Sequence, residues 1–172
     1  MTADLPPVGA TVALPLFGEP WEWQVRKRSD GAACALADRH YSRQSVGSGR
    51  LGPPGRTLVL VTADETATWL TTWPKYPMDG LDAWRCSIFR NEGPALSSDL
   101  IRSAMALTAE LWSARPGDGW VTWVDASKVR STNPGYCFIQ AGWRPDNTYV
   151  PDRRRPNLRR LVADVEIAEA AA

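Results

Sequence analysis

Apolar runs alternate with polar and glycine-rich stretches along the chain, and their spacing predicts one mixed α/β domain. The clearest β signal is the apolar run 57–62, which is followed by a turn at Asp64-Glu65 and a returning run at 67–73. Both runs are rich in β-branched or aromatic residues, so they predict a hairpin. Further strands are expected at 21–28, 83–90, 119–125 and 158–165, and Trp143 is expected to open one more. In the strand 83–90, simple alternation places Trp84, Cys86 and Ile88 on one face.

Three segments carry helical spacing instead. The strongest begins near Ser97 or Ser98, either of which is a candidate N-cap, and it ends before Arg115-Pro116-Gly117. A shorter helix is expected over 32–41. Another is expected over 135–141, with Pro134 at its first position and Gly142 at its end.

This order of elements predicts an α/β (α+β) fold with a mixed, mostly antiparallel sheet and helices on both faces. We expect an extended N-terminal arm at 1–20, a single domain at 21–166 and a disordered tail at 167–172. The net charge is +1, and no apolar run approaches the roughly 18 residues of a membrane span. The N-terminus lacks the basic and apolar regions of a secretory signal, so a cytoplasmic location is predicted. The three cysteines match no zinc spacing and are expected to be small core residues.

The chain has one histidine, His40, which is followed by Tyr41 and by a loop at 42–55 with four glycines. A long loop beside the only imidazole indicates a functional site, although a lone histidine is also a common structural residue. Asp125 ends an apolar strand, where open α/β sheets place their ligands. Its alternative role is a turn or cap residue before Ser127. Tyr136 opens the short helix, where its phenol can carry a proton or simply pack.

Arginine is concentrated in a few stretches, above all in 152–160, which holds five arginines among nine residues. Guanidinium groups at this density suit phosphates, although a solvated surface explains them equally well. The basic residues expected to contact a nucleic-acid backbone are Arg43, Arg50, Lys128, Arg130, Arg153, Arg154 and Arg155.

The order of elements resembles the Gcn5-related N-acetyltransferase (GNAT) superfamily over about residues 22–165. The segment Asn133-Pro134-Gly135-Tyr136-Cys137-Phe138-Ile139-Gln140-Ala141-Gly142-Trp143 is similar to the superfamily's late helix. The combination of His40-Tyr41, Trp123-Val124-Asp125 and this block resembles more closely the Mom-like branch of phage DNA-modification proteins.

The resemblance implies a transferase that adds an acetamido-type (carbamoylmethyl) group to the N6 amine of adenine in double-stranded DNA. This modification would protect phage DNA from restriction in the cytoplasm of a bacterial host. His40, Tyr41, Asp125 and Tyr136 are then the expected catalytic residues. They would act as acid–base groups, or His40 and Asp125 would hold a non-haem iron. The target base would be flipped out and stacked on rings such as Trp69, Trp73 or Trp84. A homodimer is one option for the assembly.

One departure from the superfamily concerns its cofactor. GNAT enzymes bind the pyrophosphate of coenzyme A with backbone N–H groups in a glycine-rich turn before the long helix. The equivalent stretch here is 90–98, in which Pro94 lacks an N–H and Glu92 adds a negative charge. This weighs against acetyl-CoA, but leaves the helix start at Ser97 and Ser98 as an anion site. Two alternatives stay open, an acyl-CoA-dependent N-acetyltransferase acting on a small-molecule or protein amine and a non-catalytic DNA-binding module.

Overall fold

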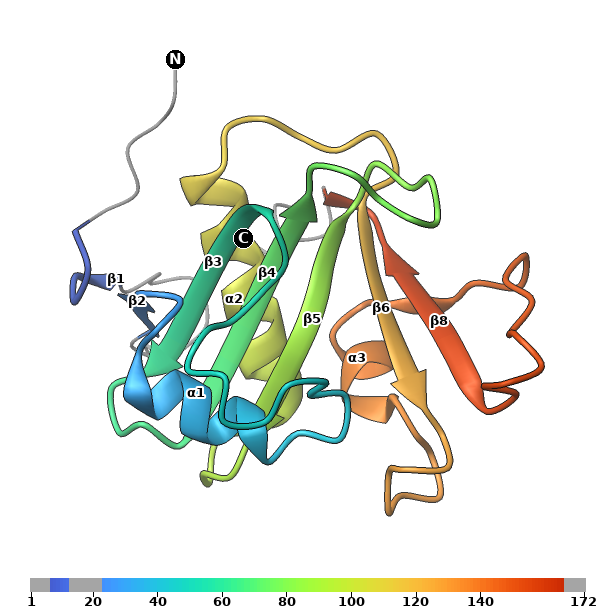
Figure 1. Ribbon diagram of the computed structural model, residues 1–172, viewed down its shortest axis with the longest axis horizontal. Coiled ribbons are helices and arrows are strands. Elements are labelled where there is room, and N and C mark those ends of the chain that lie inside the picture. Colours follow the sequence, from blue (N-terminus) through green and yellow to red (C-terminus); the bar gives the residue numbers. More distant parts are fainter. Residues whose placement is uncertain (1–6, 13–22, 166–172) are drawn as a thin grey trace.

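The computed structural model describes residues 7–12 and 23–165, whose strands form one eight-stranded sheet (Figure 1). The strands are β1 Thr11–Val12, β2 Trp23–Arg26, β3 Gly55–Thr62, β4 Ala67–Pro74, β5 Trp84–Asn91, β6 Trp120–Asp125, β7 Arg144–Pro145 and β8 Leu158–Ala163. The helices are α1 Gly31–Asp38, α2 Ser97–Leu111 and α3 Tyr136–Gln140. The strand order is β1-β2-β3-β4-β5-β6-β8-β7, and the β5–β6 pair is parallel whereas the other described pairs are antiparallel. The predicted mixed, mostly antiparallel sheet is therefore confirmed.

Helices cover both faces of this sheet. Along β3, Leu58 and Leu60 pack with α2 and α3, whereas Val59 and Val61 pack with α1. Because successive side chains of a strand point to opposite faces, a continuous apolar run is what a doubly covered strand requires. Figure 1 shows α1 and α2 on opposite sides of the sheet.

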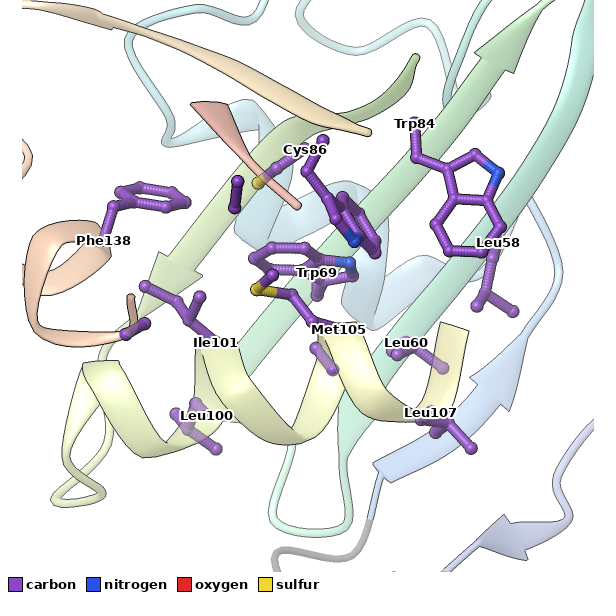
Figure 2. Packing of buried hydrophobic residues seen from close by; sticks show 14 of the residues in the cluster. Leu58, Leu60, Trp69, Trp84, Cys86, Leu100, Ile101, Met105, Leu107 and Phe138 are labelled. Carbon is purple, nitrogen blue, oxygen red and sulfur yellow. The ribbon is translucent and has the colours of Figure 1, made fainter. Parts of the chain in front are cut away.

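The layer between the sheet and α2 is filled largely by tryptophan. The Trp84 and Trp120 rings lie 5.2 Å apart, and Trp69 lies 5.9 Å from Trp120, all with edge-to-face geometry and all essentially inaccessible to water. Figure 2 shows Trp69 and Trp84 packed above Met105 and Ile101 of α2, with Phe138 of α3 at one end.

A β-bulge in β5 overturns the predicted alternation of that strand. Leu70 pairs with Ile88, but Thr71 pairs with Cys86, so Ser87 is an extra residue without a Cα partner on β4. Trp84 and Cys86 consequently face α2, whereas Ile88 packs on the α1 side. One inserted residue reverses which face the remaining side chains reach.

The helix starts also differ from the predictions. Leu96, not a serine, is the N-cap of α2, and its side chain makes no capping hydrogen bond. Gly135, at a φ of +85°, is the N-cap of α3, so Pro134 lies before the helix rather than at its first position. The helix α1 is capped by Asp30, whose Oδ1 accepts the Ala33 N–H at 3.0 Å.

The two ends of the chain are described only in part. Residues 11–12 of the predicted arm form the edge strand β1, which pairs with β2. The remaining arm residues up to 20, apart from 7–10, and the predicted tail 167–172 lie outside the described residues.

The long loop after α1 is held in place by two arginines. Arg43 pairs with Asp38 at 2.8 Å and donates to the Arg50 carbonyl at 3.1 Å. Arg28 donates to the carbonyls of Leu51, Gly52 and Pro53. These bonds hold the loop that follows His40 in one position against the rest of the protein.

Candidate functional site

The candidate site lies where β5 and β6 separate. These parallel strands pair only at Trp84–Trp120 and Arg85–Val121, after which the Thr122 hydroxyl donates to the Cys86 carbonyl at 2.8 Å. Figure 1 shows the two strands close at one end and apart at the other. The bulge at Ser87 falls at this transition, and bulges are enriched next to active sites.

Three predicted residues meet at the open end of this pair. The Tyr41 hydroxyl accepts the Asp125 backbone N–H at 3.3 Å, and the His40 ring stacks on the Tyr41 ring with centroids 4.5 Å apart. The chain therefore brings the end of α1 against the carboxyl end of β6. Tyr41 remains 39% exposed, so this meeting point is accessible to a ligand.

His40 is held as a neutral hydrogen-bond donor. Burial and the nearby positive charge of Arg90 lower the pKa of His40 from 6.5 to about 4. Its Nδ1 receives the Ser42 backbone N–H at 3.2 Å and lies 2.8 Å from the Ser42 hydroxyl. A backbone N–H can only donate, so Nδ1 is the acceptor and the ring proton lies on Nε2.

Tyr41 is also neutral near pH 7. Burial raises the pKa of its phenol above the ordinary value, and the negative charge of Asp125 acts in the same direction. A protonated phenol that accepts one N–H can still donate its own proton. Tyr41 therefore offers an O–H donor beside His40.

Asp125 is an ionised carboxylate with one oxygen already in use. Its Oδ1 accepts the Ser127 backbone N–H at 3.0 Å and the Ser127 hydroxyl at 2.6 Å. Those bonds are the main cause of its lowered pKa, and the charges of Lys128 and Arg155 add to the effect. Asp125 therefore does act as a turn residue, which was its alternative role in the sequence analysis. Asp64 and Asp146 make the same kind of turn. The other oxygen, Oδ2, has no hydrogen-bond partner among the described residues and remains able to accept a proton.

This set of side chains does not fit a metal ion. Within residues 7–12 and 23–165, no three His, Cys, Asp or Glu side chains gather as a metal site. The candidate site offers one carboxylate oxygen, Asp125 Oδ2, and one imidazole, whose Nδ1 is already bonded and whose Nε2 carries the ring proton.

Tyr136 does not join the other three residues. It is 55% exposed and lines a separate hollow of about 620 Å³ between α3, β7, β8 and the loop 146–157, whose lining excludes His40, Tyr41 and Asp125. Tyr41 lies close enough to Cys137 of α3 to feel its charge, but the neighbouring Tyr136 ring lines the hollow instead.

The residues predicted to contact a nucleic-acid backbone fall into two groups. The Arg43 side chain is only 8% exposed and anchors the loop, so its prediction as a phosphate contact is wrong. The other six, which are exposed, are Arg50, Lys128, Arg130, Arg153, Arg154 and Arg155. The turn after β6 and the loop before β8 lie side by side, because the Ala126 N–H donates to the Asn157 carbonyl at 3.0 Å.

In the turn before α2, residues 92–94 offer no open N–H group to a pyrophosphate. The Glu92 N–H donates to the Thr66 carbonyl, the Gly93 N–H donates to Asn91, and Pro94 has none. The Ser98 side chain is buried, and the Ser97 hydroxyl accepts from Asn91. Residues 92–94 therefore do not form the open N–H turn with which GNAT enzymes bind coenzyme A, and the first N–H groups of α2 are the part of this region that still suits an anion.

The negative charge of Glu92 is offset by neighbours that the sequence did not reveal. Both of its oxygens accept from Arg39 at 2.8 Å, and Arg90 donates at 2.5 Å. These bonds lower the pKa of Glu92 to about 2. The trio ties the end of α1 to the end of β5, directly beside His40.

The tryptophans proposed to stack on a flipped base are part of the core. Trp69 and Trp84 are fully buried, and Trp73 is half-buried against Trp112. That prediction is wrong, because a domain of this size uses most of its indoles as filler. The exposed rings near the basic residues are instead Tyr41 and Tyr136.

Asp146, Tyr149 and Arg160 form one wall of the hollow beside α3, and this wall was not predicted from the sequence. The one sequence feature that could have indicated it is the Asp146-x-Thr148 spacing, which is typical of an Asx turn.

Among the described residues, no helix is long and apolar enough to cross a membrane. No protein-family model, curated protein or solved structure matches this chain.

Proposed function

We propose that this chain is a Mom-like transferase with a GNAT-like fold, which adds an acetamido-type (carbamoylmethyl) group to the N6 amine of adenine in DNA and so protects phage DNA from restriction. The observation that carries the proposal is the contact between the Tyr41 hydroxyl and the Asp125 backbone N–H. Through it, two residues that are 84 positions apart bring an imidazole, a phenol and a carboxylate to one end of the sheet.

The hydrogen-bonding character of the three groups suits the edge of an unpaired adenine. That edge presents the N6 amine, a donor, beside N1, an acceptor. Asp125 Oδ2 accepts, whereas His40 Nε2–H and Tyr41 O–H donate. The N4 and N3 atoms of cytosine show the same pattern, so both bases must be examined in any test.

In the proposed reaction, the N6 lone pair attacks the methylene carbon of an electrophilic carbamoylmethyl donor. An N–C bond forms, the leaving group of the donor departs with the bonding pair, and N6 loses one proton. Asp125 is the acceptor for that proton, which then passes to solvent. The Tyr41 and His40 donors orient the base through N1.

The exposed basic residues support nucleic acid as the substrate. Lys128 and Arg155 lie close enough for their charges to lower the pKa of Asp125, so cations surround the carboxyl end of β6. Contacts of this kind hold a phosphate backbone without reading its sequence, and their affinity falls as salt rises.

The test is mass spectrometry of nucleosides from plasmid DNA in bacteria that express the chain, with and without phage infection to supply any phage-specific donor. Deoxyadenosine of increased mass is expected with the wild-type chain and is expected to fall by about 10²-fold or more with Asp125→Asn, whereas modification of deoxycytidine instead would contradict the choice of adenine. The matched control is Asp64→Asn, which alters the same kind of turn far from the site. Unmodified nucleosides from soluble protein in both cultures would contradict the proposal.

The same variants separate the alternatives. A non-catalytic DNA-binding module predicts that His40→Ala leaves restriction protection unchanged. An N-acetyltransferase predicts micromolar binding of acetyl-CoA in a calorimetric titration and no DNA binding, and the closed turn at 92–94 argues against that result.

A further inference from the structure

The hollow beside α3 has aromatic and aliphatic walls and a polar end. Its volume of about 620 Å³ lies within the range of roughly 300–1,000 Å³ found for small-molecule sites. Tyr136, Ile139 and Tyr149 contribute large side chains, of which Tyr136 and Ile139 are exposed by 55% and 37%. Exposed apolar side chains beside a hollow with a polar rim are typical of a binding site.

The far wall is fixed by a nearly buried ion pair. Asp146 and Arg160 are each 14% exposed and lie 2.7 Å apart, and the Arg160 guanidinium lies 4.8 Å from the centre of the Tyr149 ring. The Asp146 N–H also donates to the Arg160 carbonyl at 2.9 Å. Tyr149 is thus held in a set orientation before any ligand arrives.

The near wall depends on a glycine. A Cβ at Gly135, whose φ is +85°, would lie 3.0 Å from a methyl group of Leu161. This left-handed glycine lets α3 begin close to β8, which places Tyr136 at the opening of the hollow.

Cations line one side of the opening. The Arg159 side chain lines the hollow and is exposed, and it makes no hydrogen bond or ion pair within the described part of the chain. Arg153, Arg154 and Arg155 are exposed and lie between Pro151 and Pro156, two residues that also line the hollow. The hollow also adjoins the candidate site, because Leu158 in its lining is the register partner of Asp125.

We propose that this hollow binds one unpaired nucleobase of a nucleic-acid strand, next to the base that reaches Asp125. The inference rests on the proposed function in so far as nucleic acid is the partner. A planar heterocycle suits walls built from tyrosine and proline, and Arg159 with the 153–155 arginines suits the phosphates on either side. Such stacking tolerates any base, so the hollow would hold the strand while the neighbouring nucleotide reacts.

The experiment measures binding of a fluorescent single strand about 12 nucleotides long to the full chain by anisotropy, without any donor. Tyr136→Ala is expected to weaken binding roughly tenfold, whereas Tyr136→Phe retains the affinity because it keeps the ring. Tyr76→Ala is the matched control, since Tyr76 is 77% exposed on the connection between β4 and β5. Arg159→Gln is expected to reduce the salt slope by about one.

Unchanged affinity in Tyr136→Ala would overturn the inference. So would competition by an acidic tyrosine-containing peptide as strong as that by unlabelled strand, or equal competition by free adenosine monophosphate, because the site would then serve another ligand. The proposed function fails separately. Unmodified plasmid nucleosides with Tyr136-dependent binding would remove the reaction alone, whereas modified nucleosides with Tyr136-independent binding would remove this site alone.

Discussion

The two ends of the β5–β6 pair differ in what fills them. At the paired end, Trp84 faces Trp120 and both are completely buried. At the separated end, the polar residues Tyr41 and Asp125 meet and stay accessible. The same two strands thus supply a rigid apolar base at one end and a polar opening at the other, so substitutions at the paired end should act mainly on stability.

The largest expected effect is on stability, at the paired end. Trp120→Ala should lower the free energy of unfolding by about 3–5 kcal/mol, because it leaves a cavity among closely packed indoles. Denaturant unfolding followed by tryptophan fluorescence measures this. Trp120→Phe should cost less than half as much, since the Trp120 indole N–H has no hydrogen-bond partner to lose. Equal losses in the two variants would contradict the packing described here.

A smaller stability effect is expected at the separated end. Tyr41→Phe removes the acceptor of the Asp125 N–H and should lower the free energy of unfolding by about 1 kcal/mol. It should nevertheless abolish most nucleoside modification if the phenol orients the base. A variant that modifies DNA normally would show that Tyr41 only supports β6.

The third prediction concerns pH. Because the folded pKa of His40 is about 4, below its unfolded value of 6.5, its contribution to stability is full above pH 6.5 and is lost as pH falls toward 4. Because His40 is the only histidine in the chain, the NMR signals of its ring in an untagged protein can be followed without assignment. Arg90→Gln should raise the midpoint, since the Arg90 charge opposes protonation. A midpoint near 6.5 in the wild-type chain would show that the ring is freely solvated.

The smallest effect is expected from the Glu92 trio. Its lowered pKa of about 2 means that the ion pairs stabilise the fold above the ordinary glutamate pKa of 4.5 and that this contribution is lost as pH falls toward 2. Glu92 is partly exposed, so screening by solvent keeps the effect modest. Glu92→Gln should therefore differ from the wild type in urea unfolding at pH 7 but converge with it near pH 2. A constant difference at every pH would exclude the ionised carboxylate as the cause.

Elements that depend on local pattern were predictable. The hairpin β3–β4, the strand β6 and the helix α2 follow directly from apolar spacing, because each buries a face that its own sequence marks. The cap of α2 and the bulge at Ser87 were not predictable, since competing serines and a one-residue slip differ little in local preference. Those choices are decided by packing against α2 and β4.

The candidate site was predictable only in part. Asp125 follows from the rule that ligands gather at the carboxyl ends of strands, and His40-Tyr41 follows from its place before a long loop. The place of Tyr136 in a separate hollow was not predictable, because sequence order does not say in which direction each side chain of α3 points. The role of Arg43 as a loop anchor was not predictable, because the sequence does not show which guanidinium is buried by an ion pair, here with Asp38.

The bulge at Ser87 changes which side chains of β5 reach each of the two layers that cover the sheet. Before the bulge, Trp84 and Cys86 pack in the indole layer over α2. After it, Ile88 packs against α1, the helix that ends beside His40, while Phe89 packs in the layer over α2. Removing Ser87 would restore a regular strand but would send Ile88 and Phe89 to the wrong layers. A single surplus residue therefore couples the hydrophobic interior to the position of the imidazole, and length changes at that point should be tolerated far less well than substitutions.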